Sequence, residues 1–375
     1  MDGRYTVKAY GRGAWEPVSH VVQISKVRMN PYVRLLQQAL CELGIECSVA
    51  DGLSPRLVRS WRGEASPSLR GAVDVLHLHW LELLYASPHL VRSMHLWVTV
   101  LLGLGWAKSG RCKVVYTVHN LSPHEQSFPI LDRVANRALF SLADALHVHD
   151  KEAALDLARN YGRRERIYVI PHGSYIGAYP NQCTRQEARE RLGLPRRAFV
   201  YLVLGQIRRY KGIEDLVAVF GQLADEMSQL LIAGNVHDPQ YGAELARLTQ
   251  GKQGIRTWFE YVPDNDVQYF MNACDVCVLP YRDVTTSGAA VLAFSFGKPI
   301  IAPALSGFSE LAANGRAIIY SPEDNDGLRG ALHQARSEDM AEAGRKALIW
   351  AREHQWRALA PRFAGMYRDV SQAGS

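Results

Sequence analysis

Short apolar runs alternate with amphipathic segments along most of the chain. The runs are rich in β-branched and aliphatic residues and predict buried strands, whereas the apolar residues between them recur at helical spacing. In the first half, strands are predicted over 18–27, 74–79, 113–119, 145–149 and 166–170, and helices over 32–43, 90–107, 131–142 and 152–161. Such alternation is typical of βαβ units around a parallel sheet.

The pattern is interrupted at residues 173–195, which are rich in Gly, Pro and polar residues and contain one short helical piece. Further on, strands are predicted over 199–204, 230–233, 255–261, 276–280 and 299–302, helices over 212–223, 240–248, 265–273 and 288–296, and a helical tail over 339–367. The sequence therefore predicts an α/β protein with two Rossmann-like domains over 1–178 and 179–350. Residues 351–375 are predicted to form a C-terminal helix that crosses back to the first domain. Because open parallel sheets bind ligands beyond their strand carboxyl ends, we expect a ligand in the crevice between the domains.

The composition narrows the class of protein. Hydrophobic residues make up 47% of the chain and charged residues 21%, which excludes a disordered protein. Six cysteines without regular spacing favour a reducing compartment. The first ten residues are polar and show no secretory signal, and the longest apolar run, 96–107, is shorter than the roughly 20 residues that span a bilayer. We therefore expect a cytoplasmic location.

The net positive charge comes from the first half of the chain. Residues 1–180 hold 21 basic and 15 acidic residues, whereas the remainder holds 22 of each. This asymmetry favours a polyanionic partner for the first domain. No recognition motif or basic-aromatic groove pattern for nucleic acid is present, so nucleic acid is not expected as a partner.

Two segments of the second half have the residues of a phosphate site. In 204–212, Gly205 allows a tight exit from a strand, and Arg208 and Lys211 can reach back to an anion. In 281–288, three hydroxyl residues and a glycine precede a helix, whose N-terminus attracts anions. The alternatives are a solvated basic turn and an ordinary helix cap. Neither segment matches a Walker loop or a dinucleotide fingerprint.

Several short motifs resemble the GT-B glycosyltransferases, which use nucleotide sugars and consist of two facing Rossmann-like domains with a central crevice. The resemblance is carried by Gly205…Lys211-Gly212, Ile232-Ala233-Gly234, Ala273-Cys274-Asp275-Val276, Gly297-Lys298-Pro299-Ile300-Ile301-Ala302 and Gly307-Phe308-Ser309-Glu310-Leu311. It implies that Lys211 holds the donor diphosphate. Gln206 stands where the family usually has arginine, which leaves Arg208 or Arg209 to compensate.

A second departure concerns the Glu-x7-Glu pair that the retaining branch of this family carries. The corresponding positions are Val284 and Leu292, so the usual ribose-binding carboxylate is absent and the stereochemistry stays open. Residues 280–289 resemble instead a subgroup of bacterial exopolysaccharide and glycolipid enzymes that includes β-mannosyltransferase-like members. Together the motifs and the resemblance predict a donor site formed by Gly205, Arg208, Arg209, Lys211, Thr285, Thr286, Ser287, Gly288, Glu310, His172 and Gly173.

The first half has histidines at predicted strand ends. His77 and His79 lie on one face by the period of two, and His119 ends a strand that a polar loop follows. Their alternative role is that of hydrogen-bonded core histidines or a polar turn. Because the resemblance implies a histidine near the donor sugar, His119 and Glu125 are our candidates for the catalytic base. We place His79, Asn120 and Asn30 on the acceptor side.

Neither a metal nor another cofactor is expected. His77 and His79 have no further ligands at metal spacing, and the Asp-x-Asp patterns at 264–266 and 324–326 lie in loops with asparagine, typical of turns. Basic groups and backbone amides can stabilise a leaving diphosphate in place of a metal.

A basic and aromatic region surrounds the apolar helix predicted over 90–107. Trp97 and Trp106 lie on it, basic residues flank it, and Arg56, Arg59, Trp61, Arg62 and Arg70 crowd a preceding loop. Such a helix can rest on an anionic bilayer, or it is a domain helix with solvated ends. The first reading predicts peripheral attachment to the inner face of the cell membrane.

The resemblance implies a metal-independent hexosyltransferase. It would move a sugar from a UDP- or GDP-sugar to a glycan acceptor, linked to a lipid such as polyprenyl diphosphate, in bacterial polysaccharide biosynthesis. The alternatives are a non-catalytic two-domain sugar- or nucleotide-binding protein and a GT-B epimerase or phosphorylase.

Overall fold

The computed structural model describes residues 18–27, 30–54, 73–121, 128–223 and 227–372. The chain divides into two compact units, each with its own sheet. Unit 1 comprises Met1–Gly173 and Trp356–Ser375, and unit 2 comprises Ser174–Gln355. The boundary lies a few residues before the predicted one at 178, and the segment grouped with unit 1 begins at Trp356 rather than at residue 351.

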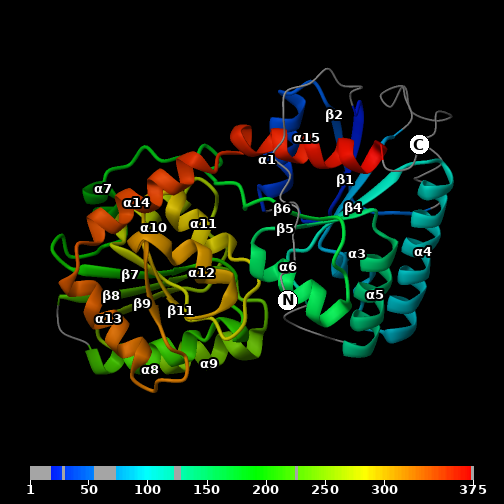
Figure 1. The fold of residues 1–375 in the computed structure, drawn as a ribbon. Helices are drawn as coiled ribbons and strands as arrows, with labels where there is room; N and C mark the ends of the chain where they lie inside the picture. The colour runs from blue at the N-terminus through cyan, green and yellow to red at the C-terminus, as the bar shows by residue number, and fades with distance from the viewer. Residues whose placement is uncertain (1–17, 28–29, 55–72, 122–127, 224–226, 373–375) are drawn as a thin grey trace. The chain divides into compact units, whose positions relative to one another are not determined.

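Unit 1 is built on a six-stranded parallel sheet in the order β2-β1-β3-β4-β5-β6 (Figure 1). Its strands are β1 His20–Ile24, β2 Glu46–Ala50, β3 Val75–His79, β4 Lys113–Thr117, β5 Ala145–Val148 and β6 Ile167–Val169. Its helices are α1 Tyr32–Cys41, α3 Glu82–Tyr85, α4 Leu90–Ser109, α5 Pro129–Leu142, α6 Lys151–Tyr161 and α15 Trp356–Gln372.

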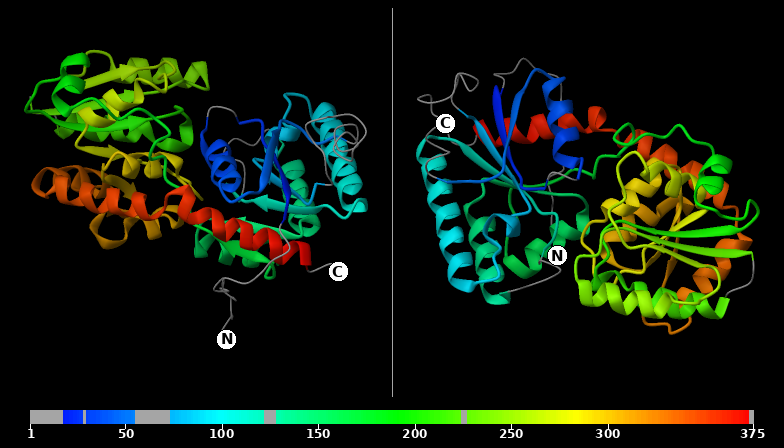
Figure 2. Two further views of the ribbon diagram at one scale, coloured as in Figure 1. Left: turned by 90° about the horizontal axis from the view of Figure 1, so that it is seen from above. Right: turned by 180° about the vertical axis from the view of Figure 1, so that it is seen from behind.

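The two faces of this sheet have different covers. α1 and α15 pack on one face, where Leu36, Phe363 and Met366 join Val75 and other strand residues in one apolar cluster. α4, α5 and α6 pack on the other face in a separate cluster. Figure 2 shows from two sides that α15, the last helix in the sequence, runs along the sheet of unit 1.

α4 has a core face and an exposed apolar face. Trp97, Val100 and Leu104 are buried against the sheet. Among the described helices, α4 is long and apolar enough to cross a membrane by length and composition, with 33% of its most apolar window buried.

Unit 2 has a second six-stranded parallel sheet in the order β12-β11-β10-β7-β8-β9. Its strands are β7 Phe199–Leu204, β8 Ser228–Ala233, β9 Ile255–Trp258, β10 Val276–Val278, β11 Ile300–Pro303 and β12 Ala317–Tyr320. Its helices are α7 Arg185–Arg191, α8 Ile213–Leu223, α9 Pro239–Thr249, α10 Val267–Ala273, α11 Gly288–Ser295, α12 Ser306–Ala312, α13 Gly327–Ser337 and α14 Met340–Glu353, with 3-10 turns η2 Arg209–Lys211 and η3 Ala313–Gly315. The α/β class with two Rossmann-like units is confirmed.

Some elements differ from the prediction. The helical tail over 339–367 is two helices, because α14 ends at Glu353 and α15 begins at Trp356. Its two tryptophans are core residues, as expected from their size: Trp350 packs on Phe294, and Trp356 packs on Tyr32. β2 and β12, and the helices α3, α12 and α13, were not predicted.

Arg189 of α7 joins this helix to the sheet of unit 2. Its side chain is 1% exposed, and its guanidinium donates to Asp275 at 2.8 Å and to the carbonyls of Ala273, Arg196 and Ala198. The same carboxylate accepts from Arg185, which is 52% exposed. Removing Arg189 takes the guanidinium donor from three backbone carbonyls and one of two ion pairs from Asp275, whereas removing Arg185 takes only an exposed ion pair.

We therefore expect Arg189→Met to lower the free energy of unfolding of unit 2 by about 3–5 kcal/mol. Arg185→Met, the matched control on the same carboxylate, should lower it by about 1 kcal/mol or less. Urea denaturation of both variants, followed by circular dichroism, measures the difference. Equal losses would contradict this role of Arg189.

Candidate functional site

The two predicted phosphate segments emerge at one point of unit 2. The sheet order reverses direction between β7 and β10, which are neighbours. Ligands of doubly wound sheets bind at such a switch point, beyond the strand carboxyl ends. Residues 205–212 follow β7, and residues 279–287 follow β10, so the topology brings both segments to this point.

Lys211 lies over the end of β7. Its Nζ is 3.6 Å from the position that a Cβ on Gly205 would take, and it lies 5.4 Å from the ring centroid of Tyr281. Lys211 is buried, and burial, together with the charge of Arg208, lowers its pKa to about 8. No carboxylate among the described residues forms an ion pair with it. A buried cation without a counter-ion is a suitable partner for an anionic ligand.

Two glycines allow the backbone to come close here. Gly205 has φ +118° and Gly234 has φ +148°, which L-residues rarely adopt. A Cβ on Gly234 would lie 1.9 Å from the carbonyl oxygen of Gly205. The motif glycines at the ends of β7 and β8 are therefore required by sterics.

The loops after β7 and β10 are bound to each other. The amide of Arg282 donates to the carbonyl of Tyr210 at 2.8 Å, and the rings of Tyr210 and Tyr281 pack edge to face. The Arg282 side chain forms ion pairs with Glu214 at 2.8 Å and Asp215 at 2.7 Å. Arg282 thus connects the two segments, and its guanidinium is paired with the carboxylates at the start of α8.

The two candidate arginines point to different partners. Arg209 forms ion pairs with Glu244 at 3.0 Å and Asp238 at 3.5 Å, and stacks over Tyr241, all on or next to α9. Arg208 donates to Gln206 at 3.1 Å, and its charge contributes to the lowered pKa of Lys211. Arg208 is therefore better placed than Arg209 to compensate for the missing family arginine.

The second segment forms the N-terminus of α11. Ser287 is the N-cap, because its Oγ accepts from the amide of Ala290. Ser287 thus has the role of an ordinary helix cap, which was the alternative to a phosphate site for this segment. The hydroxyl oxygen of Thr286 is buried, yet it has no hydrogen-bond partner among the described residues. Thr285 and Gly288 flank this cap, and α12 packs closely there, since a Cβ on Gly307 would lie 2.7 Å from the carbonyl oxygen of Thr285. A helix N-terminus with an unpartnered hydroxyl beside it has the donors of an anion site.

Glu310 lies on α12, which follows β11, the next strand of the sheet. Its side chain is exposed, and its carbonyl accepts from Arg316. The structure therefore places Glu310 on the element after the switch-point strands and leaves its carboxylate exposed.

The predicted histidines of unit 1 belong to a larger set at its carboxyl edge. Strands β3, β4, β5 and β6 each end in, or are followed by, a buried histidine, and a second pair lies two residues earlier. The edge row is His79, His119, His149 and His172, and the inner pair is His77 and His147. Residues 77 and 79, 117 and 119, and 147 and 149 share one sheet face by the period of two, the face that α1 and α15 cover.

Burial keeps these imidazoles uncharged. It lowers the pKa of His79 and His147 to about 3 and of His172 to about 4, and it lowers the pKa of His77, His119 and His149 well below the usual value. Desolvation of the cation is the main cause in all six. The edge row is therefore a set of neutral donors and acceptors across the physiological pH range.

Tyr32, the first residue of α1, lies at the centre of this row. Its ring packs edge to face on His79, Trp80, His119, His149, His172 and Trp356, with centroid distances from 4.7 to 6.0 Å. The predicted donor residues His172 and Gly173 lie in this cluster in unit 1. His172 donates to the carbonyl of Gly173, and a Cβ on Gly173 would clash with the indole of Trp356 at 2.2 Å.

His119 stacks on Trp80. The ring centroids are 3.9 Å apart with an interplanar angle of 5°. Trp80 directly follows β3 and has φ +47°, a left-handed conformation that is rare for so bulky a residue. Such strain is common at functional sites, where the surrounding structure holds it. The strained backbone of Trp80 sets one wall of the His119 environment.

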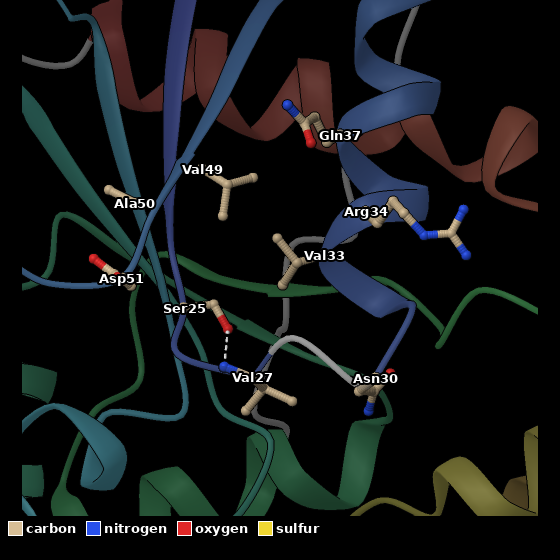
Figure 3. Close-up of a pocket in the computed structure, with 9 residues that line it drawn as sticks. All are labelled: Ser25, Val27, Asn30, Val33, Arg34, Gln37, Val49, Ala50 and Asp51. Atoms are coloured by element: carbon tan, nitrogen blue, oxygen red, sulfur yellow. Dashed lines mark hydrogen bonds between the residues drawn. The ribbon is translucent and has the colours of Figure 1, made fainter. Parts of the chain in front are cut away.

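Asn30 connects this cluster with a hollow in unit 1. Its Oδ1 accepts from the amide of Tyr32, the first residue of α1, at 3.0 Å. Figure 3 shows the hollow, of about 380 Å³, lined by Ser25, Val27, Asn30, Val33, Arg34, Gln37, Val49, Ala50 and Asp51. Asn120, half-buried, follows His119 directly. The acceptor-side candidates thus lie around the carboxyl edge of unit 1.

Glu125, the other candidate base, lies outside the described residues. So do Arg56, Arg59, Trp61, Arg62 and Arg70. Within the described ranges no group of three or more His, Cys, Asp or Glu side chains could hold a metal ion.

Sequence reasoning missed Gln23, Tyr32, His147, His149 and Tyr367. The signal for two of them was present, because residues 145–149 alternate apolar and histidine in the same way as residues 75–79. Tyr32 and Tyr367 were assigned to helices, and nothing local shows that they meet the histidines.

Two known protein families match one part of the chain each, and together they cover most of it. Residues 198–338 match the family described as "Glycosyl transferases group 1", and residues 29–174 match "Glycosyltransferase Family 4". The chain is 29% identical over 313 residues to a GDP-mannose:glycolipid 4-beta-D-mannosyltransferase of Xanthomonas campestris pv. campestris, covering 82% of this chain and 80% of that protein. It is 23% identical over 300 residues to a D-inositol 3-phosphate glycosyltransferase of Corynebacterium efficiens, covering 74% and 71%.

Solved structures share the fold at lower identity. The sucrose-phosphate synthase of Thermosynechococcus elongatus superposes with a TM-score of 0.72 at 19% identity, covering 95% of this chain and all of that one. The Anabaena protein HepE in complex with UDP and glucose superposes with a TM-score of 0.69 at 16% identity, covering 92% and 98%. These likenesses support the GT-B architecture.

The lowered pKa of Lys211 predicts that the affinity for a nucleoside diphosphate depends on pH. The Lys211 ammonium, which we expect to contact the diphosphate, loses its charge as pH rises through about 8, whereas an ordinary lysine keeps its charge there. We expect the affinity for a nucleoside diphosphate to fall by about tenfold between pH 7 and pH 9.5, as one charged contact is lost. Isothermal titration calorimetry measures it. Lys211→Met should bind weakly with little pH dependence, and the exposed control Lys346→Met should behave as the unchanged protein. A pH dependence that survives in Lys211→Met would contradict the assignment.

Proposed function

The chain is a nucleotide-sugar-dependent hexosyltransferase of the GT-B glycosyltransferases, and we propose that it transfers mannose from GDP-mannose to a lipid-linked glycan. The observation that supports this choice is the 29% identity to a GDP-mannose:glycolipid mannosyltransferase over 82% of the chain. The product would be an intermediate of a bacterial polysaccharide. We propose that the acceptor lipid carries a diphosphate, which suits the excess of basic residues in the first half of the chain.

The donor diphosphate is proposed to bind in unit 2. Lys211 and Arg208 supply positive charge, and Thr286 and the first amides of α11 supply hydrogen bonds. When the bond from the sugar to the diphosphate breaks, charge develops on the leaving oxygen, and donors already fixed in place stabilise it without reorganising. We propose that this donor set acts without a metal ion.

The acceptor hydroxyl is proposed to bind at the carboxyl edge of unit 1. His119 is neutral because it is buried, so a ring nitrogen can accept the proton that the hydroxyl loses as it attacks the anomeric carbon. Asn30 and Asn120 lie beside the same row and can orient acceptor hydroxyls. Glu125 remains a second proposed base.

A panel of nucleotide sugars with a polyprenyl-diphosphate-linked glycan tests this proposal. We expect transfer from GDP-mannose, with kcat/KM lowered by about 10²–10³ in Lys211→Met and unchanged in Lys346→Met. The assay follows product lipid by mass spectrometry and released nucleotide by chromatography. Absence of transfer from every donor would refute the proposal. Conversion of the donor sugar without an acceptor would identify an epimerase instead.

We further propose that unit 1 contacts an anionic membrane through α4 and α5. These helices lie side by side (Figure 1), and Lys108 of α4 donates to the carbonyl of Leu142 at the end of α5. Exposed apolar residues recur every four positions along α4, at Met94, Val98, Leu102 and Trp106, with Val91 80% exposed at its start. On α5 they are Ile130, Val134 and Leu142, four and eight positions apart. Two parallel apolar stripes form a face that can enter a bilayer interface.

The charges on these helices have one sign. α4 contains no acidic residue, and the acidic residue of α5, Asp132, is buried and accepts from Tyr85. The exposed charges are Arg92, Lys108, Arg133 and Arg137. Basic residues beside an apolar face favour anionic lipid.

Co-sedimentation with vesicles tests the membrane contact. We expect binding to vesicles that contain phosphatidylglycerol and weak binding to phosphatidylcholine alone. The double variant Val91→Glu/Ile130→Glu removes two side chains that are 80% exposed and should weaken binding by at least about tenfold. Ile349→Glu, an exposed apolar residue of unit 2, is the matched control. Equal binding by all three proteins would contradict this surface.

A further inference from the structure

The inner histidines of unit 1 form a chain of hydrogen bonds that starts at a backbone carbonyl. Nε2 of His147 lies 2.9 Å from the carbonyl oxygen of Ile170. A carbonyl can only accept, so His147 carries its proton on Nε2. Its Nδ1 is then an acceptor, and Thr117, whose Oγ1 is 2.9 Å away, donates to it.

Each further link follows from the one before. Because the Thr117 proton points to His147, its oxygen accepts from Nε2 of His77 at 2.7 Å. Nδ1 of His77 then accepts from the hydroxyl of Tyr367 at 2.8 Å. The oxygen of Tyr367 accepts from Nε2 of Gln23 at 3.4 Å, and the same amide nitrogen also faces the sulfur of Cys47.

The chain ends at His119. With its amide nitrogen on Tyr367, Gln23 presents its Oε1 to Nε2 of His79 at 2.7 Å, and this nitrogen donates. Nδ1 of His79 therefore accepts, and the proton comes from Nε2 of His119 at 3.1 Å. His119 has one proton in the neutral state, so its Nδ1 carries a lone pair. No hydrogen-bond partner of this Nδ1 occurs in the described part of the chain.

We propose that Gln23, Thr117 and Tyr367 are positioning residues that fix the tautomer of His119, with the proton on Nε2 and the acceptor lone pair on Nδ1. That this lone pair serves the acceptor hydroxyl rests on the proposed function, whereas the tautomer itself does not. Burial supports the uncharged state on which the chain depends. Tyr367 also gives α15 a role in the site of unit 1. Its hydroxyl links the hydrogen bonds of the inner histidines to those of the edge row.

Thr117 is the link whose removal has a distinct outcome. Thr117→Val keeps the shape of the side chain but cannot donate or accept. His77 is then no longer tied to His147, and the remaining links can run in either direction. In the reversed direction His79 donates to Nε2 of His119, which moves the His119 proton to Nδ1. The variant therefore holds His119 as a mixture of two tautomers, and Thr117→Ser restores one.

Nitrogen NMR of the full chain labelled with ¹⁵N-histidine measures this directly, with the His119 signals assigned by their loss in His119→Gln. We expect an unprotonated Nδ1 and a protonated Nε2 in the unchanged protein and in Thr117→Ser, and averaged or doubled signals in Thr117→Val. Thr99→Val, on the surface of α4, is the matched control and should leave the signals unchanged. A protonated Nδ1 in the unchanged protein would overturn the proposal, and so would a single unchanged tautomer in Thr117→Val.

The kinetic readout separates positioning from folding. Thr117→Val should lower kcat by about twofold to tenfold with little change in donor KM, since part of the population has the wrong tautomer for proton transfer. Thr117→Ser should restore kcat. If Thr117→Val does not fold, Tyr367→Phe breaks the next link and is read in the same way. The predicted tautomer in a protein that transfers no sugar would refute the proposed function and leave this inference standing.

Discussion

A neutral imidazole donates from one nitrogen and accepts at the other, and this constraint determines the interior of unit 1. Burial keeps six histidines uncharged on one face of the sheet, so their hydrogen bonds must run in a consistent direction. The carbonyl of Ile170 sets that direction, because it can only accept. Tyr367 is needed midway, which gives a physical reason why the last helix of the chain packs in unit 1. His149 is the exception: both its ring nitrogens are buried without a partner among the described residues.

The proposed donor site of unit 2 has the opposite character, because it contains groups that attract an anion. Lys211 is buried without a carboxylate partner, and the unpartnered hydroxyl of Thr286 lies beside the N-terminus of α11. Both features destabilise the empty site relative to the occupied one, and an anion relieves both. The neighbouring arginines use nearby carboxylates, Arg209 those of α9 and Arg282 those of α8. The two units therefore differ in kind: one orients neutral donors and acceptors, and the other holds unbalanced positive charge.

The sequence predicts most of this fold but only part of its site. Buried strands such as β7 are short apolar runs between glycines and amphipathic helices, so their positions follow from periodicity alone. β2 and β12 are edge strands of their sheets and have one buried residue each, so neither has that signal. Lys211 and residues 285–288 could be predicted as candidates because the chemistry of each segment is local to one loop. Gln23, Tyr32 and Tyr367 were missed because their role depends on contacts across up to 344 residues of sequence, which spacing cannot reveal.

Single-turnover kinetics with labelled GDP-mannose test the division of roles most directly. Variants of His119, the proposed base of unit 1, and of Lys211, the buried cation of unit 2, should fail at different steps. We expect His119→Gln to bind GDP-mannose with unchanged affinity and to transfer mannose at least about 10²-fold more slowly. We expect Lys211→Met to bind the donor more weakly and to lose stabilisation of the leaving diphosphate as well. Loss of donor affinity in His119→Gln, with its rate of transfer intact at saturation, would contradict these roles.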